Sequence, residues 1–214
     1  MALVEAGLPV NHPDESGVTL LHYLCDWDNG GDIAKKVELV GFLLDHGADW
    51  TTRAFIPRDT VLHRLARAGL LPGSFDDVIC RIVREWPGSP DISAVNDHGY
   101  TVLHLYSERT ILSCSAGKDM VRLLVQAGCD LNVRNNWGYA VAHGNPSPLD
   151  SIKAVDFFAD LGMDLNLPDS MGRPPLHYVV CNKPVYVRRH EQEAIVRYLL
   201  EKGVAPHPGC QSCE

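Results

Sequence analysis

A four-residue motif that ends in histidine recurs five times along this chain of 214 residues. Its copies are Thr19-Leu20-Leu21-His22, Thr60-Val61-Leu62-His63, Thr101-Val102-Leu103-His104, Ala140-Val141-Ala142-His143 and Pro174-Pro175-Leu176-His177. The histidines are separated by 41 residues (22 to 63), 41 (63 to 104), 39 (104 to 143) and 34 (143 to 177). A motif in fixed order at nearly regular intervals indicates a repeat architecture, in which each unit buries its apolar face against its neighbours.

A second pattern follows most copies of the motif: an apolar run with helical periodicity that stops at glycine. The clearest runs occupy residues 39–49, 121–132, 155–166 and 195–204, with stops at Gly47, Gly128, Gly162 and Gly203. Glycine ends a helix without strain because it adopts the left-handed conformation. Each unit is therefore predicted to contain the motif, a first helix, a loop, a second helix and a polar turn.

This combination resembles the ankyrin repeat, whose Thr-Pro-Leu-His signature and period of about 33 residues it approaches. The resemblance implies an all-α fold, an ankyrin-type helical repeat solenoid with short β-hairpin fingers. One domain is expected over residues 1–206, with a partial repeat at 1–11 and a C-terminal tail at 207–214. The full repeats are expected at about 12–49, 50–91, 92–130, 131–164 and 165–206. We expect a monomer or a part of a longer chain. The second expectation comes from the start of the sequence inside a repeat.

Composition narrows the classes of partner. The formal net charge of −8 argues against binding to nucleic acid, which needs a basic surface for the phosphates. No apolar run approaches the roughly 18 residues that a membrane span requires, and no basic segment precedes an apolar one at the N-terminus. The seven cysteines are an odd number and lie scattered. They are typical of reduced thiols and predict a cytoplasmic or nuclear protein.

Histidine side chains can bind metals or take part in catalysis, but the same role repeated five times indicates a structural function. In ankyrin repeats the motif histidine bonds the motif threonine and the loop backbone. We therefore assign Thr19, His22, Thr60, His63, Thr101, His104, His143 and His177 to a structural motif. Cys210, Cys213 and His207 offer three possible metal ligands in the tail, one short of the four that structural zinc normally takes. No cofactor, metal site or catalytic residue is expected, because no nucleotide-binding or hydrolase motif is present.

The fourth repeat is irregular, since Pro146 and Pro148 follow His143 closely and interior proline breaks a helix. We expect a short first helix there, with a bend or pocket near Trp137, Tyr139 and His143. This pocket leaves open a small-ligand or enzyme function. A third possibility is that the chain is the regulatory ankyrin region of a larger enzyme.

The resemblance favours a non-catalytic module that binds another protein on a concave face and on finger tips. Aromatic and arginine side chains dominate binding energy in such interfaces. The candidate partner-binding residues are Tyr23, Trp27, Arg64, Arg67, Arg109, Trp137 and Tyr178. The finger tips are expected to present Asp14, Glu15, Arg53, Phe55, Arg58, Asn96, Asp97, Asn135, Asn136, Trp137, Asp169, Ser170 and Met171.

Overall fold

A computed structural model describes residues 7, 9–26, 31–54, 57–68, 75–107, 115–144, 148–181 and 189–206. The chain divides into two compact units, which we describe separately. Unit 1 comprises residues 1–106 and 126–128, and unit 2 comprises residues 107–125 and 129–214. The expectation of one solenoid domain over residues 1–206 stays a prediction.

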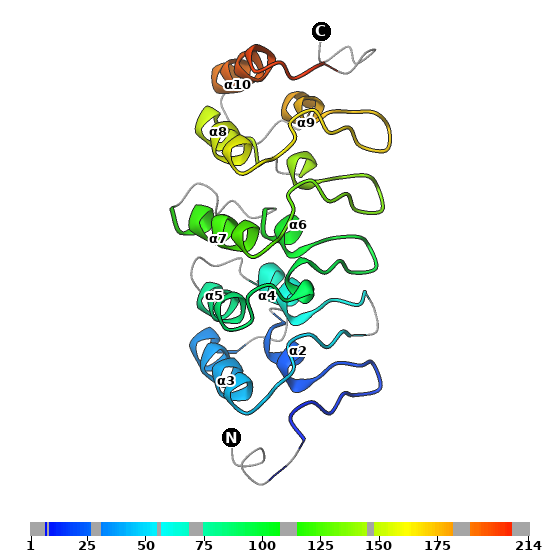
Figure 1. Cartoon of the computed structure of the whole chain (residues 1–214), viewed down its shortest axis with the longest axis vertical. Coiled ribbons are helices and arrows are strands. Elements are labelled where there is room, and N and C mark those ends of the chain that lie inside the picture. The colour runs from blue at the N-terminus through cyan, green and yellow to red at the C-terminus, as the bar shows by residue number, and fades with distance from the viewer. Residues whose placement is uncertain are drawn as a thin grey trace. The chain divides into compact units, whose positions relative to one another are not determined.

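Unit 1 is built from short first helices that pack against longer second helices (Figure 1). Its elements are α2 (Leu20–Leu24), α3 (Ile33–Asp45), α4 (Val61–Ala68), α5 (Asp76–Glu85), the 3-10 helix η2 (Pro90–Ser93) and α6 (Val102–Ser107), of which Ser107 falls in unit 2. Helix α2 contacts both α3 and α4, and α5 contacts both α3 and α4. The apolar sides of these helices therefore form one shared core, as neighbouring repeats require.

Unit 2 repeats this arrangement with a different first helix in its middle. Its elements are α7 (Ser115–Gln126), the 3-10 helix η4 (Val141–His143), α8 (Ile152–Asp160), α9 (Pro175–Cys181) and α10 (Arg189–Glu201). Helix α10 contacts α8 and α9, and α9 contacts η4. The three residues of η4 confirm the short first helix predicted for the fourth repeat, while Pro146 lies outside the described residues.

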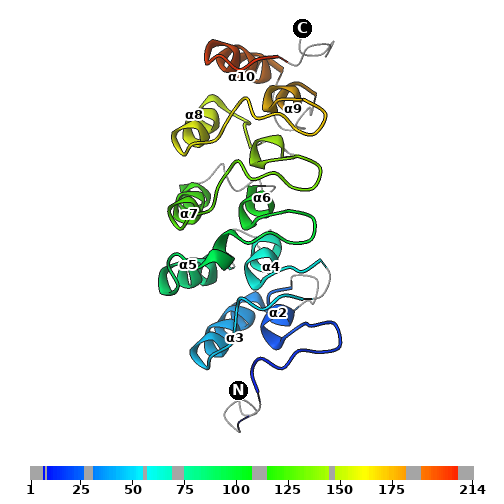
Figure 2. The ribbon, with the colours of Figure 1, turned by 45° about the vertical axis from the view of Figure 1, so that its right-hand side comes forward.

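The loops that precede the first helices extend away from the second helices in each unit, and two views agree on this (Figures 1 and 2). We call these loops fingers. Each of four fingers is closed by a pair of backbone hydrogen bonds; in one, Asn96 N–H donates to the carbonyl of Tyr100 at 3.0 Å and Gly99 N–H to that of Asn96 at 2.9 Å. Within the described segments no strand is assigned, and the antiparallel pairing is an isolated bridge between Arg53 and Thr60. The all-α class is confirmed, whereas the fingers are hydrogen-bonded turns too short to form a ladder.

Asparagine side chains tie consecutive repeats together at the turns that follow the second helices. Asn132 donates to the carbonyl of Gly162 at 2.9 Å and accepts from the N–H of Asp164 at 2.7 Å. Asn11 makes the same pair of bonds to Gly47 and Asp49. These bonds satisfy carbonyls that the helix ends leave open.

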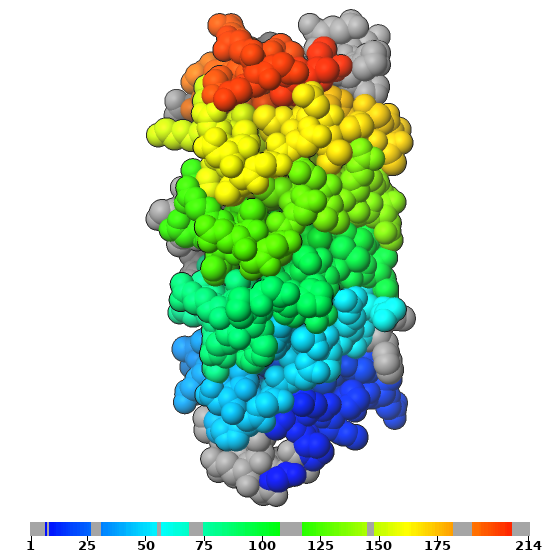
Figure 3. Space-filling view, in the orientation of Figure 1, coloured from blue at the N-terminus to red at the C-terminus, as the bar shows by residue number. Residues whose placement is uncertain are grey.

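On the face of each unit that Figure 3 shows, second helices lie on one side and fingers on the other. Polar links hold the second helices to one another: Arg81 of α5 pairs with Asp45 of α3 at 2.5 Å, and Tyr198 of α10 donates to Asp156 of α8 at 2.5 Å. None of the helices in the described segments is both long enough and apolar enough to cross a lipid bilayer.

Candidate functional site

Two motif histidines of unit 1, His22 and His63, each join a first helix to the next finger. The N–H of Thr60 donates to Nδ1 of His63 at 3.2 Å, and Thr60 Oγ1 lies 2.8 Å from the same nitrogen. This is a capping box in which histidine replaces the usual glutamate. Nε2 of His63 lies 2.8 Å from the carbonyl of Tyr100, so it carries the proton and donates. The bonds of His63 therefore link the start of α4 to the finger that contains Tyr100.

His22 and His104 make the same bonds at their own helix starts. His22 lies 2.9 Å from Thr19 Oγ1 through Nδ1 and 3.0 Å from the carbonyl of Thr52 through Nε2. His104 lies 2.9 Å from Thr101 Oγ1. Desolvation by burial lowers the pKa of His22 and of His63, and backbone carbonyls oppose that shift. Both rings are therefore favoured in the neutral form, which is the form this bonding pattern requires.

The last two motif histidines depart from this pattern. His143 accepts from the N–H of Ala140 at 3.0 Å, but alanine provides no hydroxyl, and its buried Nε2 has no hydrogen bond of regular geometry. His177 is only half-buried, follows Pro174 in place of threonine, and lies 3.8 Å from the Cys181 sulfur through Nδ1. His177 therefore cannot form the capping box, because proline has neither the hydroxyl nor the N–H that this box needs. Its assignment to the structural motif stays a prediction.

One side chain closes each of four fingers from within. Oδ1 of Asn135 accepts from the N–H groups of Trp137 and Tyr139, at 3.0 and 2.9 Å. Asp14, Asn96 and Asp169 make equivalent pairs. Asn96, Asn135 and Asp169 are buried, so their expected exposure at finger tips was wrong. These turns fix the backbone and direct the residues beside them outward.

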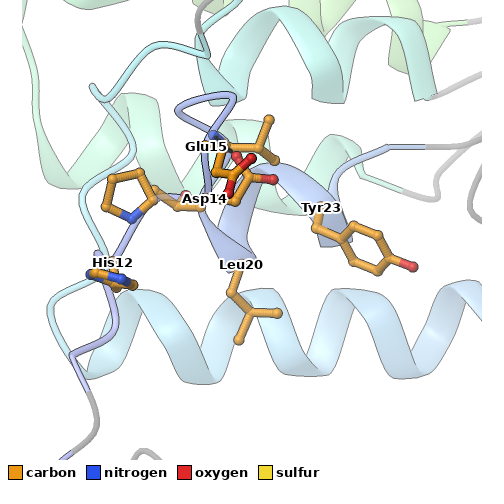
Figure 4. A pocket seen from close by; sticks show the side chains of 8 residues that line it. His12, Asp14, Glu15, Leu20 and Tyr23 are labelled. Atoms are coloured by element: carbon orange, nitrogen blue, oxygen red, sulfur yellow. Dashed lines mark hydrogen bonds between the residues drawn. The ribbon is translucent and has the colours of Figure 1, made fainter.

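An open hollow of about 510 Å³ lies beside the first finger of unit 1 (Figure 4). It is lined by His12, Pro13, Asp14, Glu15, Val18, Thr19, Leu20 and Tyr23. Leu20 and Tyr23 are 49% and 55% exposed, a large fraction for apolar side chains next to each other on a helix. Tyr23 is thus at the surface, as its candidate role requires. Leu20 was missed because it lies inside the motif, where an apolar residue is expected to face the core.

Two neighbouring fingers of unit 2 present a second exposed pair. Trp137 is 48% exposed and Met171 is 69% exposed. The two fingers touch, since the side-chain Oγ of Ser170 donates to the backbone carbonyl of Trp137 at 2.6 Å. Gly138 permits this approach: a Cβ there would lie 2.4 Å from the backbone nitrogen of Ser170. Both side chains are at the surface, where a partner-binding role would require them.

Residues 98–136 match the family model of the ankyrin repeat. The chain contains an ankyrin repeat. The matched segment includes the motif Thr101–His104 and the glycine stop at Gly128, the two features from which the resemblance was drawn. A comparison with curated proteins gives no match. Ankyrin repeats are in general protein-interaction modules and are typically non-catalytic.

The two arginines predicted for the partner-binding face, Arg64 and Arg67, have different surroundings. Arg64 is half-buried, and its Nη1 lies 3.1 Å from Asp26 Oδ2. Arg67 is more exposed, with Nη1 3.9 Å from the buried carboxylate of Asp59. Arg64 therefore has a structural partner, and Arg67 is the more accessible of the two cations. Trp27 and Arg109 lie outside the described residues, as do His207, Cys210 and Cys213.

Tyr178 is buried, with 8% of its surface exposed, so placing it on the partner-binding face was wrong. Its hydroxyl donates to Asp169 at 2.6 Å, and the guanidinium of Arg173 donates to the same carboxylate at 2.7 Å. Arg173 also reaches the hydroxyl of Tyr139 at 3.2 Å. The finger that directly precedes α9 therefore covers the ring with Arg173, a contact that the position after the motif histidine does not reveal.

This cluster is where a ligand pocket was expected in the irregular fourth repeat. The His143 ring lies 5.3 Å from Tyr178 and 6.2 Å from Tyr139, between centroids. Burial raises the pKa of Tyr178. Burial alone would also raise the pKa of Asp169, but its hydrogen bonds lower it to about 2. A phenol that stays protonated and a carboxylate that stays charged suit a fixed hydrogen bond better than proton transfer. Among the described residues, no group of three or more His, Cys, Asp or Glu is placed to hold a metal ion.

Proposed function

We propose that this ankyrin-repeat chain is a non-catalytic module that binds another protein through its fingers and first helices. The observation that supports it most is the exposed pair Trp137 and Met171 on two touching fingers of unit 2. Tryptophan is enriched among residues that dominate interface energy, and apolar side chains gathered on one surface mark interaction sites.

The fingers also favour binding through their stiffness. The turn that carries Trp137 is closed by two bonds to Asn135, and the turn that carries Met171 is closed by two bonds to Asp169. Side chains held on such turns lose little conformational entropy when a partner binds. Exposed apolar surface and a fixed backbone together are what a preformed recognition surface needs.

The test is quantitative affinity capture from cell extract, followed by mass spectrometry and by affinity measurement on each captured protein. In the double variant Trp137→Ala with Met171→Ala, we expect the captured partner to lose about tenfold or more in affinity, about 1.4 kcal/mol. Leu200→Ala is the control, because Leu200 is 45% exposed on α10, away from the fingers. Equal capture by the wild type and the double variant, with the fold intact, would reject this surface.

A further inference from the structure

The hollow of unit 1 combines an apolar floor with an acidic rim. Leu20 and Tyr23 project outward from α2, and the carboxyl groups of Asp14 and Glu15 lie on the finger above them (Figure 4). Both apolar side chains are about half exposed. A partner that covers them removes this apolar surface from water, which favours binding. The floor therefore suits an aliphatic or aromatic side chain.

The rim selects the charge of what enters. None of the eight residues that line the hollow is lysine or arginine. Asp14 is fixed in place, since its Oδ1 accepts from the N–H groups of Ser16 and Val18 at 2.8 and 2.9 Å. Glu15 follows it at an exposed position. Two carboxylates with no cation among the lining groups attract a positively charged segment and repel a negative one.

The whole chain adds to this preference. Its formal net charge of −8 creates a negative field that draws basic partners and opposes approach by a second copy of the same chain. An acidic peptide is repelled both by the carboxylates of the rim and by the negative field of the chain. Charge complementarity thus favours one class of occupant over the others.

We propose that this hollow receives a basic segment of a partner protein. One aliphatic or aromatic side chain of that segment packs on Leu20 and Tyr23, and its lysine or arginine side chains lie against Asp14 and Glu15. The proposal deepens the proposed function and rests on it, since it names the chemistry of a partner. The hollow acts as a site of its own in unit 1, separate from the Trp137 and Met171 pair of unit 2.

The probe is a random-peptide phage library selected on the full chain, with removal of phage that bind the variant Leu20→Ser with Tyr23→Ser. We expect the selected peptides to carry several Lys or Arg residues around one large apolar residue. As synthetic peptides they should lose about tenfold or more in affinity on the double variant and about threefold or more on Glu15→Lys. Raising NaCl from about 50 to 300 mM should weaken binding further, because rim charges are screened.

Two variants control for general effects: Leu200→Ser removes an exposed leucine and Glu201→Lys reverses an exposed charge, both on α10. They should bind the peptides as the wild type does. Thermal unfolding checks the fold of every variant, and Glu15→Lys, an exposed change, keeps the test decisive if the double variant unfolds. Selection of acidic or uncharged peptides, of none, or of peptides that bind Glu15→Lys equally well would overturn the proposal.

The two proposals fail in different ways. If basic peptides do not bind the hollow but captured proteins still depend on Trp137 and Met171, the occupant is wrong and the general function stands. If the chain associates with itself and Leu20→Ser abolishes that association, the occupant is a second copy, which also overturns the inference. If no finger variant weakens either peptide binding or protein binding, both proposals are rejected.

Discussion

Arg58 occupies a finger position at which the other fingers have glycine. The equivalent glycines are Gly17, Gly99, Gly138 and Gly172, all with positive φ. Arg58 has a φ of 56°, in the left-handed region that side chains with a Cβ avoid. The backbone hydrogen bond that closes the second finger runs from the N–H of Ala54 to the carbonyl of Asp59. It spans one residue more than the equivalent bond in the other fingers.

Arg58→Gly should stabilise the protein. The left-handed conformation costs an L-residue about 1–2 kcal/mol, and the greater freedom of glycine in the unfolded chain offsets part of this, so the expected net gain is about 0.5–1 kcal/mol. Urea unfolding measures it. Arg197→Gly, in the exposed middle of α10, should instead lower stability by about 1 kcal/mol. A fall in stability for Arg58→Gly would show that the arginine side chain contributes more than its backbone strain removes.

At the scale of elements, the predicted helices were right in kind and displaced at their starts. The apolar runs begin at residues 39, 121, 155 and 195, whereas the second helices begin at Ile33, Ser115, Ile152 and Arg189. The extra residues form first turns that include exposed polar side chains such as Lys35 and Glu191, which carry no apolar pattern. Asp32 marks the true start of α3, since its side chain accepts from the N–H of Ala34.

Contact between two fingers of unit 2 depends on Gly138. Replacing it by alanine strains a backbone with φ of 79° and sets a Cβ 2.4 Å from the nitrogen of Ser170, so we expect a loss of about 2 kcal/mol or more. Gly162→Ala is the matched control, because φ is 88° but no atom lies within 4 Å of its Cβ; that change should cost only about 1 kcal/mol. Chemical denaturation of both variants compares them, and equal losses would mean that the fingers part without cost.

For the whole molecule, three motif histidines share one electrostatic property across the two units. His22, His63 and His143 are buried, and desolvation lowers the pKa of each from its ordinary value of 6.5. In the unfolded chain these rings take up protons near pH 6.5, but in the folded chain they do so only at lower pH. Stability is therefore complete above the unfolded pKa and is lost as pH falls below it.

We expect the free energy of unfolding to fall steadily from about pH 7.5 to pH 5.5, by up to about 1.4 kcal/mol per histidine for each pH unit below the unfolded pKa. Urea titrations at several pH values measure this slope. His63→Gln should flatten it, because this change removes one of the three buried rings whose pKa is lowered. Asp169 does not contribute in this range, because its folded pKa of about 2 and the ordinary carboxyl value both lie below it. A slope that is unchanged by His63→Gln would contradict the linkage.

The sequence by itself determined the order of motif, first helix, second helix and glycine stop. These signals are local, since they consist of a threonine three residues before histidine and the apolar period of a helix. The structural role of His22, His63 and His104 came from the resemblance to ankyrin repeats, and their capping bonds were seen only in the structure. Only the tertiary structure decided which side chains are accessible. Tyr178 and Arg64 are covered because Asp169 pairs with the first and Asp26 with the second, while Leu20 and Met171 stay exposed. The exposed fraction of a side chain depends on such contacts in the folded chain, whereas a repeat pattern indicates only which positions are equivalent.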